Sequence, residues 1–295
     1  MKPAPFDYIA PDSLDAALAA VNEYGYDAKL LAGGQSLVPM MNFRLAQPAV
    51  IVDLNGLSEL DTIGHDDSGA LRLGAMVRQR RLERDPLVAE AAPLLHEAMP
   101  HVAHPQIRNR GTLGGSLAHA DPAAELPVVM VALDGRFRLR RTGGERWIDA
   151  RDFFTGIFTT DLAAEEIVVE VELPPLPLRT GVAFMEMARR HGDYALAGGA
   201  AVVSLDENGT CTKARLVYLN AGEVPVVAEQ AAALLAGQAP SESVIEEAAV
   251  VVSEREVEPM SDIHATADFK RHLAKVLTAR ALRQAFARAG NGGGG

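Results

Sequence analysis

Apolar residues near the start of the chain predict a strand, a helix and a second strand. Positions 6–10 form a short β-rich run. From Leu14 onward, apolar residues recur at i, i+3, i+4 and i+7, which is one apolar stripe of a helix. Ser13 suits the N-cap of this helix and Gly25 its C-terminal end. The apolar run at 29–32 then predicts a buried strand, so the chain opens as a small α/β lobe.

The middle of the chain has the pattern of a larger lobe of strands and Ala- and Leu-rich helices. One more strand of the first lobe is expected at 49–54. Positions 167–173 alternate apolar and acidic residues, which predicts a strand with one exposed face. The run 142–144 predicts a hairpin turn. The other expected strands are 71–75, 136–141 and 146–148, and the expected helices are 78–84, 86–99 and 122–133.

The last third of the chain places strands before helices. Pro174–Pro177 is a proline-rich linker, and 206–209 has the composition of a hairpin turn. Strands followed by helices indicate an α+β module with helices on one face of an antiparallel sheet. The expected strands are 182–188, 199–204 and 214–220, and the expected helices are 226–235, 243–252 and 266–289.

The predicted fold class is therefore α+β, in three folded segments and a tail. The two lobes span 1–56 and 57–176, and a C-terminal α+β domain spans 177–290. The glycine-rich tail, 291–295, has no side chains that could build a core and is expected to be disordered.

Composition narrows the class of protein. With 48% hydrophobic and 23% charged residues, the chain is typical of a globular protein. A net charge of −11 argues against a nucleic-acid partner, because such proteins are usually basic. No apolar run reaches the roughly 18 residues of a membrane span, and the first residues lack the apolar core of a secretory signal. The single Cys211 excludes an intramolecular disulfide and a four-cysteine iron–sulfur cluster in this chain, which favours the cytoplasm.

A pair of adjacent glycines follows the strand at 29–32. The segment Ala32–Ser36 reads Ala-Gly-Gly-Gln-Ser, and Leu37 continues it. Adjacent glycines allow backbone conformations closed to other residues, so their N–H groups can converge on one anion. The Gln and Ser side chains add donors. The segment favours a diphosphate cradle, and a tight turn without a ligand remains the alternative.

A second glycine pair lies in Thr112–Gly115, and two such segments suggest a ligand long enough for two clamps. Together they closely resemble the motifs A-G-G-[QH]-S and T-[IL]-G-G of the FAD-binding medium subunit of the molybdenum hydroxylases. This is the carbon monoxide dehydrogenase medium-subunit family, related to the flavin domain of xanthine dehydrogenase. Residues 108–111, 120–122 and 188–195 are also similar to that family, so the resemblance covers nearly the whole chain.

The resemblance implies a fold, a cofactor and partners. The fold would be a two-lobed FAD-binding domain of the vanillyl-alcohol oxidase/MurB (PCMH) type, followed by the C-terminal α+β domain. This chain would bind FAD, whereas molybdopterin and [2Fe–2S] clusters would lie on partner subunits. An iron–sulfur small subunit and a molybdopterin large subunit would complete a dimer of heterotrimers. The FAD would pass electrons from the iron–sulfur clusters to an external acceptor.

The resemblance also assigns roles to residues. The first motif would hold the FAD diphosphate through backbone N–H groups and the Ser36 hydroxyl, and the second would clamp diphosphate and ribityl. The candidate cofactor-binding residues are Lys29, Ala32, Gly33, Gly34, Gln35, Ser36, Leu37, Asn109, Gly111, Thr112, Gly114, Gly115, Ser116, Asp121, Glu125, Val168 and Tyr194.

Several of these residues have a second interpretation. Lys29, and Arg110 beside the second motif, could equally face solvent. Asp121 would lie near the ribityl or pyrimidine end of the flavin, or would cap a helix that starts at the following proline. Glu125 matches an acidic position of the family, or is a first-turn helix carboxylate. Tyr194 would cover the flavin ring and gate access to it, or would be a core tyrosine in a strand.

Histidines near the second motif do not favour a metal. His96 and His101 are five residues apart, and Pro100 interrupts the helix that a zinc motif would need. We instead expect His101 and His104 to orient the second glycine segment by hydrogen bonds.

No catalytic nucleophile, metal set or acid–base pair is evident, which suits a subunit whose cofactor carries the chemistry. Two alternatives remain: a stand-alone FAD-dependent oxidase or reductase of the same superfold, and a non-catalytic binding scaffold. The family often carries a Lys before the Arg189–Arg190 pair, whereas this chain has Met185–Met187 there. This difference leaves the electron acceptor open.

Overall fold

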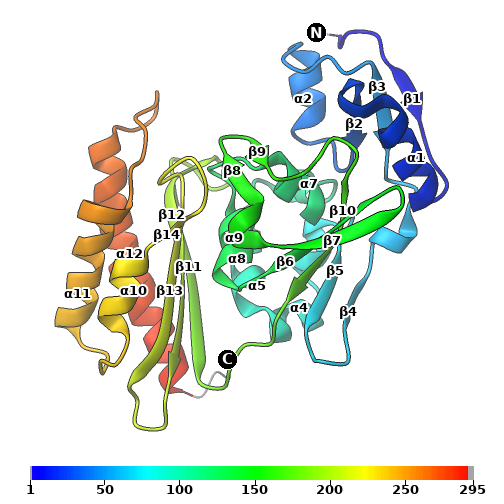
Figure 1. Ribbon diagram of the computed structural model, residues 1–295. Coiled ribbons are helices and arrows are strands. Elements are labelled where there is room, and N and C mark those ends of the chain that lie inside the picture. The colour runs from blue at the N-terminus through cyan, green and yellow to red at the C-terminus, as the bar shows by residue number, and fades with distance from the viewer. Residues whose placement is uncertain (1, 292–295) are drawn as a thin grey trace.

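The computed structural model describes residues 2–291 and confirms the α+β class. In Figure 1 the N-terminal lobe lies at the upper right and the C-terminal helices lie at the left, with the second lobe between them. No helix within residues 2–291 combines the length and the apolar character needed to cross a membrane.

Lobe 1, at the N-terminus, is a three-stranded parallel sheet in the order β1-β3-β2. The Ser13 hydroxyl accepts the Ala16 N–H and so begins the first helix, whose apolar stripe packs on one face of the sheet. Because the strands are parallel, the segments that follow β2 and β3 emerge at the same edge. The elements are β1 (Asp7–Ile9), α1 (Leu14–Tyr24), β2 (Ala28–Leu31), α2 (Leu37–Asn42) and β3 (Val50–Asp53).

Lobe 2 is an antiparallel sheet in the order β4-β5-β10-β6-β7, with short helices packed on it. Its strands are β4 (Ile63–His65), β5 (Leu71–Gly74), β6 (Arg136–Arg141), β7 (Gly144–Asp149) and β10 (Ile167–Leu173), with a separate ribbon of β8 (Phe154–Gly156) and β9 (Thr159–Thr160). Its helices are α3 (Gln79–Leu82), α4 (Pro86–Ala91), α5 (Pro93–Ala98), α6 (Pro105–Arg108), α7 (Leu113–His119), α8 (Glu125–Ala132) and α9 (Ala150–Phe153).

The prediction that the strand at 167–173 has one exposed face is wrong. β10 is the central strand, and both of its faces are covered. One face packs in the main core, and Ile167 and Val169 on the other face pack against lobe 1. Glu172 pairs with Arg72 at 2.7 Å and also with Arg136. Ion pairs therefore cover the acidic positions that the alternation assigned to solvent.

Two predicted helices have different bounds. The helix expected at 86–99 is broken, because Pro93 has no N–H to continue α4 and instead begins α5. The helix expected at 122–133 begins only at Glu125.

The C-terminal domain is an antiparallel sheet in the order β11-β12-β13-β14, followed by helices. The helix expected at 226–235 starts as a short strand and becomes helical at Glu229. Asn291 ends the last helix, and the rest of the expected tail lies outside the described residues. The elements are β11 (Thr180–Ala188), β12 (Ala195–Leu205), β13 (Cys211–Leu219), β14 (Val226–Val227), α10 (Glu229–Leu235), α11 (Glu242–Val251) and α12 (Ala267–Gly290). Short 3₁₀ turns lie at Gly25–Asp27, Ser58–Leu60 and Met99–His101, and a π turn lies at Val252–Glu256.

The C-terminal sheet is buried on both faces. Side chains alternate between faces of a strand. In β11, Ala183 faces the helices α10–α12, whereas Val182 and Phe184 join the main core with α5 and α8 of lobe 2. One apolar core therefore runs across the linker between lobe 2 and the C-terminal domain.

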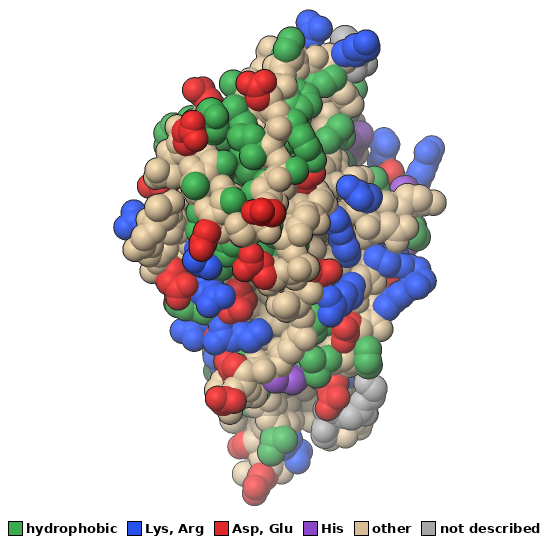
Figure 2. Space-filling model, turned by 90° about the vertical axis from the view of Figure 1, so that its right-hand side faces the viewer, with side chains coloured by type: hydrophobic (Ala, Val, Ile, Leu, Met, Phe, Trp, Pro, Cys, Tyr) green, Lys and Arg blue, Asp and Glu red, His purple; other side chains and the backbone are tan. Residues whose placement is uncertain are grey.

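Lobe 1 exposes large apolar side chains. Figure 2, which looks onto the side that carries lobe 1, shows hydrophobic side chains gathered in its upper half and basic side chains mainly around its middle. Exposed aromatic residues of this lobe are Phe6, Tyr8, Tyr24, Tyr26 and Phe43. Gathered apolar surface of this kind marks an interaction site in many proteins.

Candidate functional site

The first glycine motif lies at the carboxyl edge of the parallel sheet, between β2 and α2. Gly34 has φ +72°, a conformation that L side chains rarely adopt. Within the described chain, the four N–H groups of Gly33–Ser36 have no hydrogen-bond acceptor. The side-chain amide of Gln35 donates to the Gly33 carbonyl at 3.0 Å, within the motif itself. The motif therefore presents consecutive free donors, as an anion cradle requires.

The second glycine motif is the first turn of helix α7, and its N–H groups are already used. Gly114 donates to the Ala75 carbonyl at 2.8 Å, and Gly115 donates to the Thr112 hydroxyl at 3.1 Å. Ser116 donates to the Thr112 carbonyl at 3.3 Å. Helix formation and strand contact therefore consume the backbone N–H groups of Gly114 and Gly115, and the clamp role of the second motif stays a prediction.

The glycines of the second motif instead allow close packing. A Cβ on Gly114 would lie 2.6 Å from the Ala75 Cβ, and one on Gly115 would lie 2.7 Å from the Thr112 hydroxyl oxygen. A Cβ on Gly111 would collide with the Gln79 side chain. Gly114 therefore lets α7 pack closely on the end of β5, and Gly111, just before the motif, lets the chain pack closely on α3.

The two motifs touch each other. A Cβ on Gly33 would collide with the Arg110 carbonyl and lie 2.7 Å from the Gly111 Cα. A Cβ on Gly115 would lie 3.3 Å from the Ala32 Cβ. The predicted two clamps are therefore brought together at the contact of lobes 1 and 2.

Three residues that the sequence did not single out tie the motifs together. The Asn55 amide donates to the Ala32 carbonyl at 2.9 Å. Arg78 donates to the Asn55 side-chain oxygen at 2.6 Å and also to the Arg110 carbonyl. Asp53 holds Asn55 by accepting its backbone N–H at 2.8 Å. The sequence does offer one signal for Asn55. It follows shortly after β3, and the carboxyl ends of parallel strands lie at the same edge of a sheet, as the first motif after β2 does.

The charge of Asp53 is favoured by its donors. Partial burial raises the pKa of this carboxyl, but hydrogen bonds from Tyr8 and Asn55 outweigh that effect and leave the pKa lowered. Asp53 therefore stays ionised at neutral pH and holds Asn55 in place.

A basic hollow adjoins the second motif. Its volume is about 650 Å³, and its lining includes Arg78, Arg84 and Asn109. The positive charge beside the glycine motifs favours an anionic ligand there.

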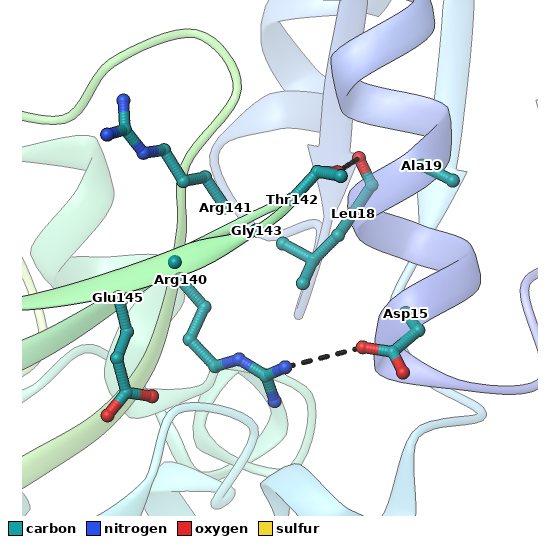
Figure 3. A pocket seen from close by; sticks show the side chains of 9 residues that line it. Asp15, Leu18, Ala19, Arg140, Arg141, Thr142, Gly143 and Glu145 are labelled. Carbon is teal, nitrogen blue, oxygen red and sulfur yellow. Dashed lines mark hydrogen bonds and ion pairs between the residues drawn. The ribbon is translucent and has the colours of Figure 1, made fainter.

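A second hollow, of about 440 Å³, lies between α1 and the β6–β7 hairpin (Figure 3). Arg140 reaches Asp15 at 3.3 Å, and the Thr142 hydroxyl donates to the Leu18 carbonyl at 3.4 Å. None of the seventeen candidate residues lines it, so it belongs to the contact between the lobes.

A group of ionisable residues marks the other end of the candidate site. The Asp121 carboxyl accepts the Ala123 N–H at 2.9 Å in a turn before α8, so its interpretation as the helix N-cap is wrong. Glu125 is 8% exposed. Burial and the charge of Glu186 raise its pKa to about 8.

Tyr194 is 75% exposed, in the turn between β11 and β12. The core-tyrosine interpretation is therefore wrong. Desolvation, followed by the charges of Asp121 and Glu125, raises the pKa of its hydroxyl.

Phe158 is a further aromatic residue, beside Ala120, that sequence reasoning missed. It has φ +51°, its N–H donates to the Ala120 carbonyl at 3.2 Å, and its ring lies 5.0 Å from that of His119. No local pattern in the sequence marks this position.

Other candidate residues make none of these hydrogen bonds. Lys29 and Asn109 are exposed, and Leu37 is the first residue of α2. Val168 is 5% exposed and packs in the main core. His101 contacts Glu186 at 3.4 Å rather than the second motif.

Comparison with known proteins identifies both parts of the chain. Residues 4–176 match the family described as the FAD binding domain in molybdopterin dehydrogenase. Residues 182–285 match the CO dehydrogenase flavoprotein C-terminal domain.

Relatives match over their whole length. The chain is 40% identical to the 6-hydroxypseudooxynicotine dehydrogenase complex subunit alpha of Paenarthrobacter nicotinovorans, covering 98% of this chain and 97% of that relative. It is 37% identical to the carbon monoxide dehydrogenase medium chain of Hydrogenophaga pseudoflava, covering 98% and 99%.

Solved structures of related proteins also match nearly the whole chain. The structure of carbon monoxide dehydrogenase from Hydrogenophaga pseudoflava matches with a TM-score of 0.94 and 38% identity, covering 98% of this chain and 99% of that one. Quinoline 2-oxidoreductase from Pseudomonas putida 86 matches with a TM-score of 0.93 and 42% identity, covering 98% and 99%. The chain therefore belongs to the FAD-binding medium-subunit family of the molybdenum hydroxylases, the carbon monoxide dehydrogenase medium-subunit family.

Proposed function

We propose that this oxidoreductase subunit passes electrons from the iron–sulfur clusters of a partner subunit through FAD to an external acceptor. The observation that carries the proposal is the row of free N–H groups at Gly33–Ser36, pressed against the second glycine motif. Four consecutive unpaired donors at a glycine turn suit the diphosphate of FAD. When bound, FAD supplies the two-electron chemistry.

Different residues of the chain would bind different parts of FAD. Gly33–Ser36 would donate to the diphosphate, and Ser36 Oγ would add one more donor. Asn55 and Arg78 would keep the two motifs in contact. At the other end, Asp121 and Tyr194 would flank the flavin ring, with Tyr194 limiting the access of oxidants.

The proposed partners are an iron–sulfur small subunit and a molybdopterin large subunit, in a dimer of heterotrimers. Relatives that match over nearly their full length are named as a medium chain or as the subunit of a complex. The exposed aromatic residues of lobe 1 offer apolar surface for such a contact. Two-fold closure is the commonest way in which assemblies of this kind end. We propose the cytoplasm as the location, because the single cysteine, Cys211, is free and buried.

The test has two stages. The purified chain is incubated with FAD, desalted and examined for flavin absorbance, which we expect at one FAD per chain. The chain is then co-expressed with the two partner subunits, and the flavin is followed by rapid mixing with substrate. Flavin reduction by substrate is expected in the complex and not in the isolated chain. Substrate turnover by the isolated chain would instead support a stand-alone flavoenzyme, and a chain that binds no FAD would support a scaffold.

A further inference from the structure

Asn220 lies where the C-terminal sheet meets lobe 2. It directly follows β13, whose last residue, Leu219, still pairs with Gly198 of β12. Its φ is +50°, a left-handed conformation that Asn adopts more readily than most residues. The chain therefore turns away from β12 at this residue, and the backbone and the side chain of Asn220 contact different parts of the molecule.

The hydrogen bonds of Asn220 join two segments of the proposed ring end of the FAD site. Its backbone N–H donates to the Pro122 carbonyl at 2.7 Å, in the turn of lobe 2 that begins at Asp121. Its side-chain amide donates to the Ala195 carbonyl, directly after Tyr194, at 2.8 Å and to the carbonyl of the following residue at 3.2 Å. One residue therefore ties the Asp121 turn to the Tyr194 turn.

A buried lysine fixes the direction in which the Asn220 amide points. Lys270 Nζ donates to Asn220 Oδ1 at 3.3 Å and to the Asp262 carboxylate at 2.6 Å. An ammonium group has donors and no acceptor, so it holds the Asn220 oxygen toward itself. The NH₂ group of Asn220 is thereby directed at the carbonyls of β12, where it is needed as a donor.

Lys270 occupies a position at which an apolar side chain would pack well. It is 2% exposed, and Leu273 and Leu277, at i+3 and i+7, belong to the stripe of α12 that packs on the start of β12. Replacing a buried charge pair by well-packed apolar residues is often neutral or stabilising. Packing alone therefore does not account for a charge at this position, whereas the orientation of Asn220 does.

We propose that Asn220 is a positioning residue that sets the separation of the Asp121 and Tyr194 turns, and that Lys270 acts through it by holding its amide in one orientation. The inference rests on the proposed function, in which Asp121 and Tyr194 flank the flavin ring. Asp121 comes from lobe 2 and Tyr194 from the C-terminal domain, so the hydrogen bonds of Asn220 fix the opening through which an oxidant reaches the ring.

The first test uses the full chain without FAD and compares two Asn→Asp variants. Asn220→Asp keeps the size of the side chain and an acceptor for Lys270, but its carboxylate cannot donate to the carbonyls of β12. Asn208→Asp is the control, because it adds the same charge at an exposed turn between β12 and β13. Hydrogen exchange of every segment is followed by mass spectrometry, together with the rate of tryptic cleavage.

The expected response is local. Asn220→Asp should raise exchange in residues 189–196 about tenfold, because the hydrogen bonds that close this turn are lost. Trypsin should cleave faster after Arg189 and Arg190, which are exposed in the same turn. Asn208→Asp should leave both rates unchanged. Equal exchange of residues 189–196 in the two variants overturns the proposal, and so does an equal rise throughout the chain, which would show a role in global stability instead.

A double-variant cycle tests whether Lys270 acts through Asn220. Lys270→Met keeps an unbranched side chain and removes the charge, so the Asn220 amide can point either way, and exchange in residues 189–196 should rise about threefold. Asn220→Gly tolerates the left-handed backbone and removes the amide. Adding Lys270→Met to Asn220→Gly should cause no further rise. Additive effects of the two changes contradict the role assigned to Lys270.

The link to the flavin is tested in the assembled complex with FAD bound. Asn220→Asp is expected to keep full FAD content, because the donors of Gly33–Ser36 are unchanged. It should alter the visible circular dichroism of the flavin and speed its reoxidation by oxygen about threefold, since a displaced Tyr194 no longer limits access. An unaltered spectrum and reoxidation rate at full FAD content overturn the positioning role. Absence of FAD from the wild-type chain refutes the proposed function and leaves the exchange result intact.

Discussion

The two glycine motifs look alike in sequence and differ in what they do. At Gly33–Ser36 the backbone N–H groups are free, and Gly34 has a left-handed conformation. At Gly114 and Gly115 the N–H groups are used within the protein, and the missing side chains make room for neighbours. We therefore propose that the first motif binds the ligand and that the second motif brings it into position.

The difference teaches that a glycine pair has two distinct physical uses. The first is conformational freedom that exposes donors, and the second is the absence of a Cβ where two elements meet. Because Gly33 packs on the backbone of Arg110 and Gly111, the binding motif depends on the packing motif for its shape.

The largest expected effect comes from filling the packing motif. Gly114→Val should lower the free energy of unfolding by about 3 kcal/mol, because overpacking a filled core costs roughly 1–3 kcal/mol and this Cβ already meets the Ala75 backbone. Urea unfolding measures the loss. Gly64→Val is the control, since a Cβ there has no neighbour within 4 Å. Full stability of the Gly114 variant would show that the packing motif is loose.

The binding motif should respond differently. Gly34→Val should cost about 1–2 kcal/mol of stability, as a left-handed residue with a side chain does, and should weaken FAD binding at least 100-fold. Gly209→Val is matched to it, because Gly209 has φ +80° and open space in the turn between β12 and β13. Fluorescence titration with FAD should separate the two variants, and equal FAD affinity in both would remove the cradle assignment.

The link between the motifs should give a smaller effect. Arg78→Met removes the donors to Asn55 and to the Arg110 carbonyl and should weaken FAD binding about tenfold, or about 1.4 kcal/mol. Arg271→Met is the control, because Arg271 pairs with Asp268 at the surface of α12. The same FAD affinity in both variants would mean that the motifs stay together without Arg78.

The smallest effect on stability is expected at the far end of the site. Tyr194→Ala should change the free energy of unfolding by no more than about 0.5 kcal/mol, as surface substitutions usually do, and should leave FAD content unchanged. Stopped-flow reoxidation of the reduced flavin should become faster if Tyr194 shields the ring. Unaltered reoxidation kinetics would show that Tyr194 does not shield the flavin ring.

Much of the fold follows from local pattern. The stripe that starts at Leu14, with its cap at Ser13, predicts α1, and the apolar runs predict β2, β3 and the long C-terminal strands. The burial of β10 could not be predicted, because its acidic residues are covered by arginines from strands distant in the sequence. The alternation of apolar and polar residues along a strand shows how polar each face of the strand is. It does not show which other parts of the chain cover that face.

The candidate site, like the fold, could be predicted only in part from the sequence. The residues of both motifs are evident in the sequence, but their different uses depend on tertiary hydrogen bonds such as that of Gly114 to Ala75. Arg78 is simply the first residue of an expected helix in the sequence, and only the fold brings it to Asn55.

The central claim is that the free N–H groups of the first motif hold the FAD diphosphate. Amide chemical shifts and hydrogen exchange, measured by nuclear magnetic resonance with and without FAD, test it directly. FAD should shift and protect the amides of Gly33–Ser36, whereas those of Gly114 and Gly115, already bonded within the protein, should change little. The reverse pattern, with unchanged exchange at Gly33–Ser36 and new protection in the second motif, would contradict the account.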